Sequence, residues 1–413
     1  MEMRYEKVSK KVQEKSYEAE RYIIHLLNCA LHDKIPENKP EKCSWKMLYA
    51  IAKKNNVENC ISPAINNYCG KIPGEIIESW KQEKDNTLYR QLCFEIEREQ
   101  ILRGMEENGI SYLLLKGILI ANYYPAPGMR WFCDNDILYG FVEPDSDGGY
   151  KFRGTNKKEQ DQFIHRSEEI MCNVMVKLGY DAKRIGGEHD IYQKAPFFNF
   201  ELHHYLGSIE NRTREYYYNP WKRAIRKSDN FYQYFFSDED EYIYLIAHAY
   251  KHFAHAGCGI RTLVDEYVIL QSKSLMNWNY IKSELRTIGI EGFEEELRRS
   301  ALHAFSEEME LEYADWSMIH YMFGSGTYGT MENLVNNELQ KIKKEGTIQK
   351  KTVRWQYIKN RIFIEEKSIK EYFPVFYKYK VLQIFLPVYR ILRGIVIHPR
   401  KLLTEYKIWK GFR

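Results

Sequence analysis

The sequence predicts an α+β protein in which a small mixed β-sheet is flanked by helical regions. Apolar residues recur at helical spacing near the N-terminus, short apolar runs bounded by Gly and Pro follow near 110, and a helical, aromatic-rich pattern returns near 213. We therefore expect an N-terminal helical region at 1–105, an α+β core at 106–212, and a C-terminal helical domain with a basic tail at 213–413.

Composition narrows the class of protein. The chain has 413 residues, of which 44% are hydrophobic and 29% charged, and this excludes a disordered or low-complexity protein. It contains neither an apolar run long enough for a conventional membrane span nor a signal peptide, so we expect a cytoplasmic protein. None of the 8 cysteines lies in a Cys-x-x-Cys pair, which favours reduced thiols without disulfide partners.

The first half of the predicted core contains two strands. A long polar-rich helix over 75–107 leads into a short apolar run at 110–115, which has the length of a buried strand. Lys116-Gly117 ends this strand, and a short helix is expected over 118–124. A turn rich in proline follows, and a second strand is expected over 130–139.

The second half of the core begins with a Gly- and Asp-rich stretch at 140–155, which predicts an exposed loop or a hairpin insertion. A helix is expected over 156–178, with Asn156 as its N-cap and Gly179 as its stop. This helix leads back to the sheet.

Three carboxylates are expected to gather on one face of that sheet. Two further strands are predicted at 189–194 and 197–203. Side chains alternate along a strand, so Asp134 and Asp136 share one face, about 6–7 Å apart. Glu201 projects from one face of its strand, and Phe198 and Phe200 project from the other. We expect the Phe-rich face to pack on helices.

Clustered carboxylates need a positive partner, and oxygen ligands suit Mg²⁺. Two such ions about 4 Å apart can align an attacking hydroxyl and a leaving pyrophosphate. Asp-x-Asp alone also fits a solvated strand or the turn at its end. Lys116 and Gly117 at a helix start add a group that can hold phosphate.

Several segments in order resemble the bacterial "uncharacterised nucleotidyltransferase" family, part of the DNA polymerase β-like nucleotidyltransferase superfamily. The resemblance covers roughly residues 20–400. The segments that carry it are Leu114-Leu115-Lys116-Gly117, 124–130, Asp134-Asn135-Asp136-Ile137-Leu138, Leu178-Gly179-Tyr180, 189–192, Glu201-Leu202-His203, His248 with His252, 261–265, Tyr372-Phe373-Pro374 and Leu386-Pro387.

The resemblance implies a small mixed sheet flanked by helices, Mg²⁺ dependence, and transfer of an NMP from an NTP. By this analogy Asp134 and Asp136 bind the metal ions, and Glu201 is a third metal ligand or the general base for the acceptor hydroxyl. The chain departs from better-characterised members, which carry Gly-Ser where it has Lys116-Gly117. Lys116 would then act on the triphosphate as a point charge.

Other residues have two interpretations each. Arg130 either clamps a phosphate or pairs with one of the two aspartates. His203 either touches substrate or is a structural histidine at the strand edge. Arg261 either reaches the nucleotide phosphates from the helical side or pairs with Asp265.

Three histidines, at 248, 252 and 255, share a helix face at the spacing i, i+4, i+7. The spacing permits metal binding, but no Glu lies at 249, so the zinc-peptidase pattern is absent. The alternative is a packed polar cluster.

Positive charge is concentrated in the C-terminal part of the chain. Residues 337–413 hold 19 Lys/Arg and 6 Glu, a balance of +13, against −9 for the rest. A basic tract around Trp355 and Tyr357 is either a nucleic-acid footprint or a solvated helix. Residues 381–397 are either a buried terminal helix or an amphipathic helix on a membrane surface.

The sequence favours a Mg²⁺-dependent nucleotidyltransferase that uses an NTP and an acceptor hydroxyl on a small molecule, sugar, protein or RNA. The alternative is a nucleotide-binding module on the same fold that performs no transfer. An Asp-x-Asp glycosyltransferase would need a doubly wound nucleotide domain before the Asp pair, and residues 1–105 do not supply one.

Overall fold

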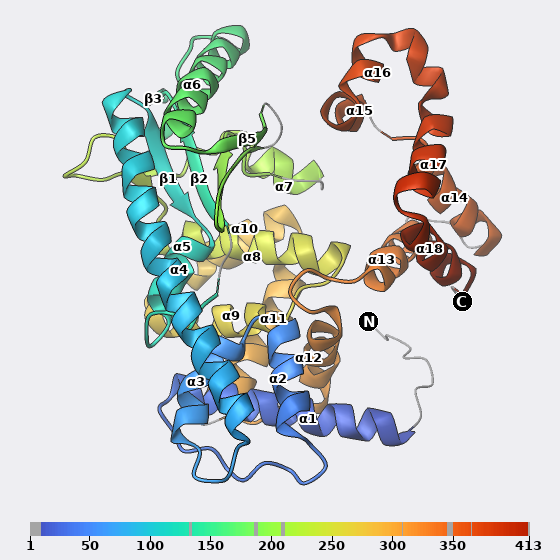
Figure 1. Ribbon diagram of the computed structural model, residues 1–413. Coiled ribbons are helices and arrows are strands. Elements are labelled where there is room, and N and C mark those ends of the chain that lie inside the picture. The colour runs from blue at the N-terminus through green and yellow to red at the C-terminus, as the bar shows by residue number, and fades with distance from the viewer. Residues whose placement is uncertain are drawn as a thin grey trace. The chain divides into compact units, whose positions relative to one another are not determined.

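The computed structural model describes residues 10–131, 134–185, 189–207, 211–307, 309–344, 350–364 and 366–411 (Figure 1). Contacts divide the chain into two compact units. The first comprises Met1–Lys251 and Gly259–Thr327, and the second comprises His252–Cys258 and Tyr328–Arg413. Each unit has a hydrophobic cluster of its own. The division into 1–105, 106–212 and 213–413 that the sequence indicates is not tested by these units and stays a prediction.

The first unit is built on a mixed seven-stranded sheet, which confirms the predicted α+β class. The strand order is β5-β6-β7-β2-β1-β9-β8. The strands are β1 (Ser111–Leu115), β2 (Asn135–Gly140), β5 (Asp181–Arg184), β6 (His189–Lys194), β7 (Phe198–His203), β8 (Ile225–Arg226) and β9 (Gln233–Phe235).

Twelve helices accompany this sheet in the described part of the chain up to residue 325. They are α1 (Lys10–Leu31), α2 (Trp45–Lys54), α3 (Glu58–Asn67), α4 (Gly74–Glu107), α5 (Gly117–Ile120), α6 (Lys157–Lys177), α7 (Asn211–Tyr216), α8 (Asp238–His255), α9 (Arg261–Ser272), α10 (Trp278–Ile288), α11 (Glu291–Phe305) and α12 (Tyr313–Ser325). A short 3₁₀ turn, η1 (Ala121–Tyr123), follows α5.

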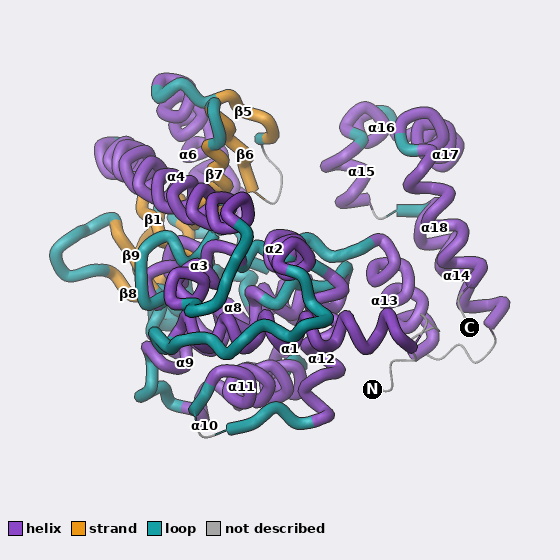
Figure 2. Tube along the Cα trace, turned by 60° about the horizontal axis from the view of Figure 1, so that its bottom comes forward, coloured by secondary structure: helices purple, strands orange, loops and turns teal. Residues whose placement is uncertain are grey.

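One face of the sheet carries the core, because alternate strand residues are large and apolar. Phe200 and Leu202 of β7 join Ile137 of β2 in a buried cluster. Helices α4 and α6 supply Phe94 and Met171 to the same cluster, and Figure 2 shows both helices alongside the strands. The expected packing of the aromatic face on helices is thus present, which leaves the other side chains of β2 and β7 on the opposite face.

The elements near the predicted carboxylates match expectation except at the start of β2. The long helix, the strand at 110–115 and the short helix after Lys116 all form. The strand expected over 130–139 was wrong at its start, because β2 begins at Asn135 and Asp134 precedes it. Residues 132–133 lie outside the described part of the chain.

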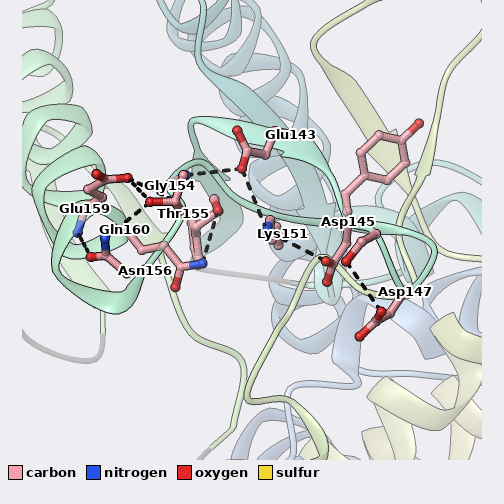
Figure 3. Close-up of polar contacts among 12 residues, drawn as sticks. Glu143, Asp145, Asp147, Lys151, Gly154, Thr155, Asn156, Glu159 and Gln160 are labelled. Atoms are coloured by element: carbon pink, nitrogen blue, oxygen red, sulfur yellow. Dashed lines mark hydrogen bonds and ion pairs between the residues drawn. The ribbon is translucent and has the colours of Figure 1, made fainter.

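The Gly- and Asp-rich stretch forms a hairpin of β3 (Val142–Pro144) and β4 (Tyr150–Phe152), the second of the two expected alternatives (Figure 3). The Nζ of Lys151 lies 3.9 Å from the Glu143 carboxylate and 3.8 Å from that of Asp145, so the hairpin carries its own charge pairing.

Helix α6 is capped as the sequence predicts. Asn156 Oδ1 accepts the backbone N–H of Glu159 at 3.1 Å, and the Glu159 carboxylate accepts the backbone N–H and hydroxyl of Thr155 (Figure 3). This cap fixes where α6 begins over the sheet.

The second unit is helical in its described part. Its helices after residue 328 are α13 (Met331–Lys344), α14 (Lys350–Ile362), α15 (Glu366–Tyr372), α16 (Pro374–Lys378), α17 (Leu386–Ile397) and α18 (Pro399–Gly411), with a 3₁₀ segment η2 (Lys380–Phe385) before α17. Within the described residues no single helix is both long and apolar enough to cross a bilayer. Lys380–Ile397 and Pro399–Gly411 meet that criterion only as a pair bent by 109°.

Candidate functional site

Asp136 and Glu201 lie on the sheet face opposite the aromatic core. β2 and β7 run parallel, and Asp136 is the register partner of Glu201. Partners in neighbouring strands project to the same side of a sheet, so these two carboxylates share a face. His203, two residues after Glu201, lies on that face as well.

Asp136 is the centre of the polar contacts on this face. Its Oδ1 accepts the Lys116 Nζ at 2.6 Å and the His203 Nε2 at 2.8 Å. The side chains of Asp136, His203 and Lys116 are 4%, 9% and 16% exposed, so the contacts are shielded from water. Burial alone would raise the pKa of Asp136, but Lys116 and His203 outweigh it and hold that pKa well below its usual range.

Lys116 reaches Asp136 from an unusual backbone position. It follows β1 directly and precedes α5, with φ 53° and ψ −122°. A positive φ is uncommon for a residue with a Cβ and is found most often where function constrains the chain. Burial would lower the pKa of Lys116, yet the neighbouring Asp136 raises it, so the ammonium stays charged.

The pKa of Glu201 is shifted upward, in the opposite direction from that of Asp136. Burial, followed by the charges of Asp136 and Asp134, raises the pKa of Glu201 to about 7, and Lys116 opposes the shift. The influence of Asp134 shows that the residue before β2 lies within electrostatic reach of Glu201. A carboxyl whose pKa is near neutrality can accept a proton at physiological pH.

Two further residues on this face were missed by the sequence analysis. His189 of β6 is the register partner of His203, and its Nε2 lies 3.4 Å from Glu201 Oε2. Arg184 Nη2 lies 3.1 Å from the same ring nitrogen. Burial, then the charges of His203 and Arg184, lowers the pKa of His189 to about 3, so its ring is neutral. The alternation of β6 could have indicated His189, but only the pairing register places it beside Glu201.

The ring nitrogens of His189 and His203 and a Glu201 oxygen lie within 4.8 Å of one another, which is close enough to bind one cation. Asp136 and, just before β2, Asp134 supply further oxygen donors, while Lys116 and Arg184 supply positive charge nearby. Burial and the charges of Asp136 and Asp134 raise the pKa of Glu201 more than Lys116 and Arg184 lower it. The residues present therefore fit a divalent cation.

Arg130 is tied to the helical part of the first unit. Its guanidinium forms a bidentate pair with Asp265 of α9, at 2.7 and 2.9 Å, and Tyr124 donates to the same carboxylate at 2.7 Å. Asp134 is among the charges that raise the pKa of Arg130. Asp265 thus takes Arg130 as its ion-pair partner, where the sequence analysis had suggested Arg261.

The remaining predicted ligands lie at the edges of this arrangement. Gly117 opens α5, and its carbonyl accepts Arg130 Nη1 at 3.4 Å. Arg261 opens α9, and its Nη1 donates to the carbonyl of Trp131 at 2.8 Å. Tyr244 of α8 is fully buried within electrostatic reach of Lys116 and Asp136. α8 therefore lies near the acidic face.

The His248, His252 and His255 cluster does not form a metal-type grouping among the described residues. A grouping that does form lies on the other face of the sheet, where Glu168, Asp190 and His204 approach one another. That face is the helix-covered core.

Comparison with known proteins gives one match. The model of the family described as "Uncharacterised nucleotidyltransferase" matches residues 41–141 and 161–306, which is more than half of the chain. The match contains Lys116, both aspartates and Glu201, and it ends before the second unit's segment from residue 328. No curated protein and no solved structure matches the chain. The chain belongs to the uncharacterised nucleotidyltransferase family.

Proposed function

We propose that this protein transfers an NMP from an NTP to an acceptor hydroxyl with release of pyrophosphate, and that the reaction requires Mg²⁺. The observation that carries the proposal is the register of β2 and β7, which sets Asp136 beside Glu201 on the face away from the core. The family assignment supports nucleotidyl transfer in general. The acceptor remains a small molecule, sugar, protein or RNA.

Asp134, Asp136 and Glu201 are the residues that would hold the cations, and ring nitrogens of His189 and His203 lie within 4.8 Å of a Glu201 oxygen. Two Mg²⁺ ions bound there would supply charge stabilisation for the attacking oxygen and for the leaving pyrophosphate.

Glu201 serves in this proposal either as a metal ligand or as the group that takes the proton from the acceptor hydroxyl, and its raised pKa of about 7 favours the second role. The acceptor oxygen then forms a bond to the α-phosphorus, and the bond to the pyrophosphate oxygen breaks. Lys116 supplies a positive charge to the phosphates. Gly117, Arg130, His203 and Arg261 are proposed nucleotide contacts.

The second candidate is nucleotide binding without transfer. The 2.6 Å pair between Lys116 and Asp136 favours it, because the ammonium already neutralises the carboxylate that a metal ion would need. The Lys116-Gly117 sequence in place of Gly-Ser favours it as well.

Pyrophosphate release from each NTP, measured with Mg²⁺ and a cell extract as acceptor source, distinguishes the two candidates. The nucleotidyltransferase hypothesis predicts pyrophosphate release that disappears in the Asp136→Asn variant and when the metal is chelated. Asp145→Asn, in the β3–β4 hairpin, is the matched control and should retain release. Release that is unchanged in Asp136→Asn would reject the site. NTP binding by calorimetry without any release would support the binding module.

A further inference from the structure

The C-terminal part of the second unit exposes a concentrated apolar surface. Residues 380–411 contain 14 of the 35 exposed large apolar side chains in the described chain. Single exposed apolar residues are normal, but a concentration of this kind indicates a contact surface. The 14 residues are Val381, Leu382, Ile384, Phe385, Val388, Tyr389, Ile391, Leu392, Ile395, Val396, Ile397, Leu402, Leu403 and Tyr406.

Helix α17 carries an ordered stripe of these residues. Val388, Ile391, Leu392 and Ile395 occupy positions i, i+3, i+4 and i+7, and they are 57%, 45%, 57% and 54% exposed. Residues at this spacing lie on one face of a helix. The helix is therefore amphipathic, with its apolar side in water.

The other side of α17 is held by its own unit. Leu386 is buried, and Arg390 Nη1 donates to the carbonyls of Arg361 and Ile362 at 2.8 Å each. These contacts with the end of α14 fix the rotation of α17. The apolar stripe is thus the side that its own unit leaves uncovered.

Helix α18 also has one side bound to its own unit and apolar residues exposed on another. Glu405 is buried and accepts the Tyr357 hydroxyl at 2.6 Å and the Arg361 guanidinium at 2.6 and 3.1 Å. Leu403 and Tyr406, on the other side of α18, are 60% and 54% exposed. The inner face of α18 thus packs on α13 and α14 through Glu405, Ile408 and Trp409, while Leu403 and Tyr406 stay exposed.

Charge identifies the partner. Residues 380–411 contain seven Lys/Arg and a single acidic residue, Glu405, which is turned inward. Arg390 is one of these basic residues and is bound to α14, and the other six are Lys380, Arg393, Arg400, Lys401, Lys407 and Lys410. A nucleic acid would pair with these charges but leave the apolar stripe in water. The surface of an anionic bilayer accepts both, because headgroup phosphates meet Lys and Arg while apolar side chains enter the boundary with the acyl chains.

We propose that the exposed face of η2, α17 and α18 binds the surface of an anionic membrane. The stripe of Val388, Ile391, Leu392 and Ile395 enters the headgroup–acyl boundary, and the basic residues of α18 contact lipid phosphates. The family match ends at residue 306, before this surface begins, and the surface contains none of the residues proposed to bind nucleotide or metal.

Vesicle flotation with the full-length protein tests the proposal. We expect binding to vesicles of equimolar phosphatidylcholine and phosphatidylglycerol, weaker binding as salt rises, and little binding to phosphatidylcholine alone. Leu392→Glu with Ile395→Glu should reduce binding at least tenfold. Arg400→Glu and Lys401→Glu should each reduce it roughly fivefold.

Leu275→Glu is the matched control, because Leu275 is 97% exposed in the first unit and should leave vesicle binding unchanged. Thermal unfolding followed by circular dichroism checks that the variants fold. Failure of the wild type to float with anionic vesicles overturns the proposal, as does undiminished binding by the folded Leu392→Glu, Ile395→Glu variant. A dimer that this variant dissociates would instead assign the face to a second copy of the chain.

Discussion

Replacement of Lys116 by Met tests the electrostatics of the acidic face. The Lys116 Nζ lies 2.6 Å from Asp136 Oδ1, and at an effective dielectric constant of about 20 such charges attract by about 6 kcal/mol. Desolvation of both groups offsets much of this attraction. The His203 hydrogen bond to Asp136 remains in the variant, so we expect the free energy of unfolding to fall by about 3 kcal/mol, the low end for breaking a buried pair.

Added Mg²⁺ should reverse part of this loss. The variant retains three carboxylates and lacks their ammonium partner, so a divalent cation binds there more tightly than in the wild type. A ligand at a tenfold excess over its Kd stabilises the folded state by about 1.4 kcal/mol. Urea denaturation with and without Mg²⁺ measures both quantities.

The matched control is Lys34→Met. Lys34 forms an ion pair of the same length, 2.6 Å, with Glu307, but the two side chains are 43% and 64% exposed. We expect its loss to leave the free energy of unfolding nearly unchanged and insensitive to Mg²⁺. If Lys116→Met is as stable as this control, or if Mg²⁺ gives it no more stability than the wild type, the electrostatic account of the site is wrong.

Three further predictions concern protonation and pairing. Glu201→Gln should abolish pyrophosphate release. The wild type should lose stability as pH rises from about 4.5 to about 7, because burial and then Asp136 raise the pKa of Glu201, and the variant should not show this loss. A variant whose stability depends on pH as the wild type's does would contradict this. Glu266→Gln should stabilise the protein above pH 8 and have no effect below pH 4.5, since burial raises the pKa of Glu266 to about 8; thermal melts across pH decide it. Arg130→Lys should lower the free energy of unfolding by about 2 kcal/mol, because one of two charge-assisted bonds to Asp265 is lost; urea midpoints equal to wild type would refute the role.

Local signals allowed much of the sheet to be predicted from the sequence. The period-two alternation of β7 placed Glu201 and His203 together and opposite Phe200, and the structure has them so. The N-cap at Asn156 also followed from the sequence, because capping depends on residues within one turn. These features need no knowledge of distant parts of the chain.

The sequence analysis also missed β5, β8 and β9, and the first two of these strands lack such signals. β5 is Asp181–Arg184, whose residues are mostly exposed and polar, and β8 has two residues. Edge strands of this kind form because neighbouring strands pair with them, and their own residues show little β preference.

The charge partners of the site could not be predicted because they are far apart in sequence. Arg130 and Asp265 are separated by 135 residues, and Lys116 and Asp136 by 20. The expectation that Arg130 holds a phosphate rested on its nearness to the aspartates in sequence. Tertiary packing decides which carboxylate each cation meets, and a single sequence does not record it.

Incubation with α-labelled NTPs and Mg²⁺ in a cell extract tests the central claim most directly. The proposed transfer predicts label in a covalent product, one pyrophosphate released for each label incorporated, and neither product with Asp136→Asn. Retention of all label in free nucleotide, with every NTP and under conditions where the wild type binds nucleotide, would contradict it.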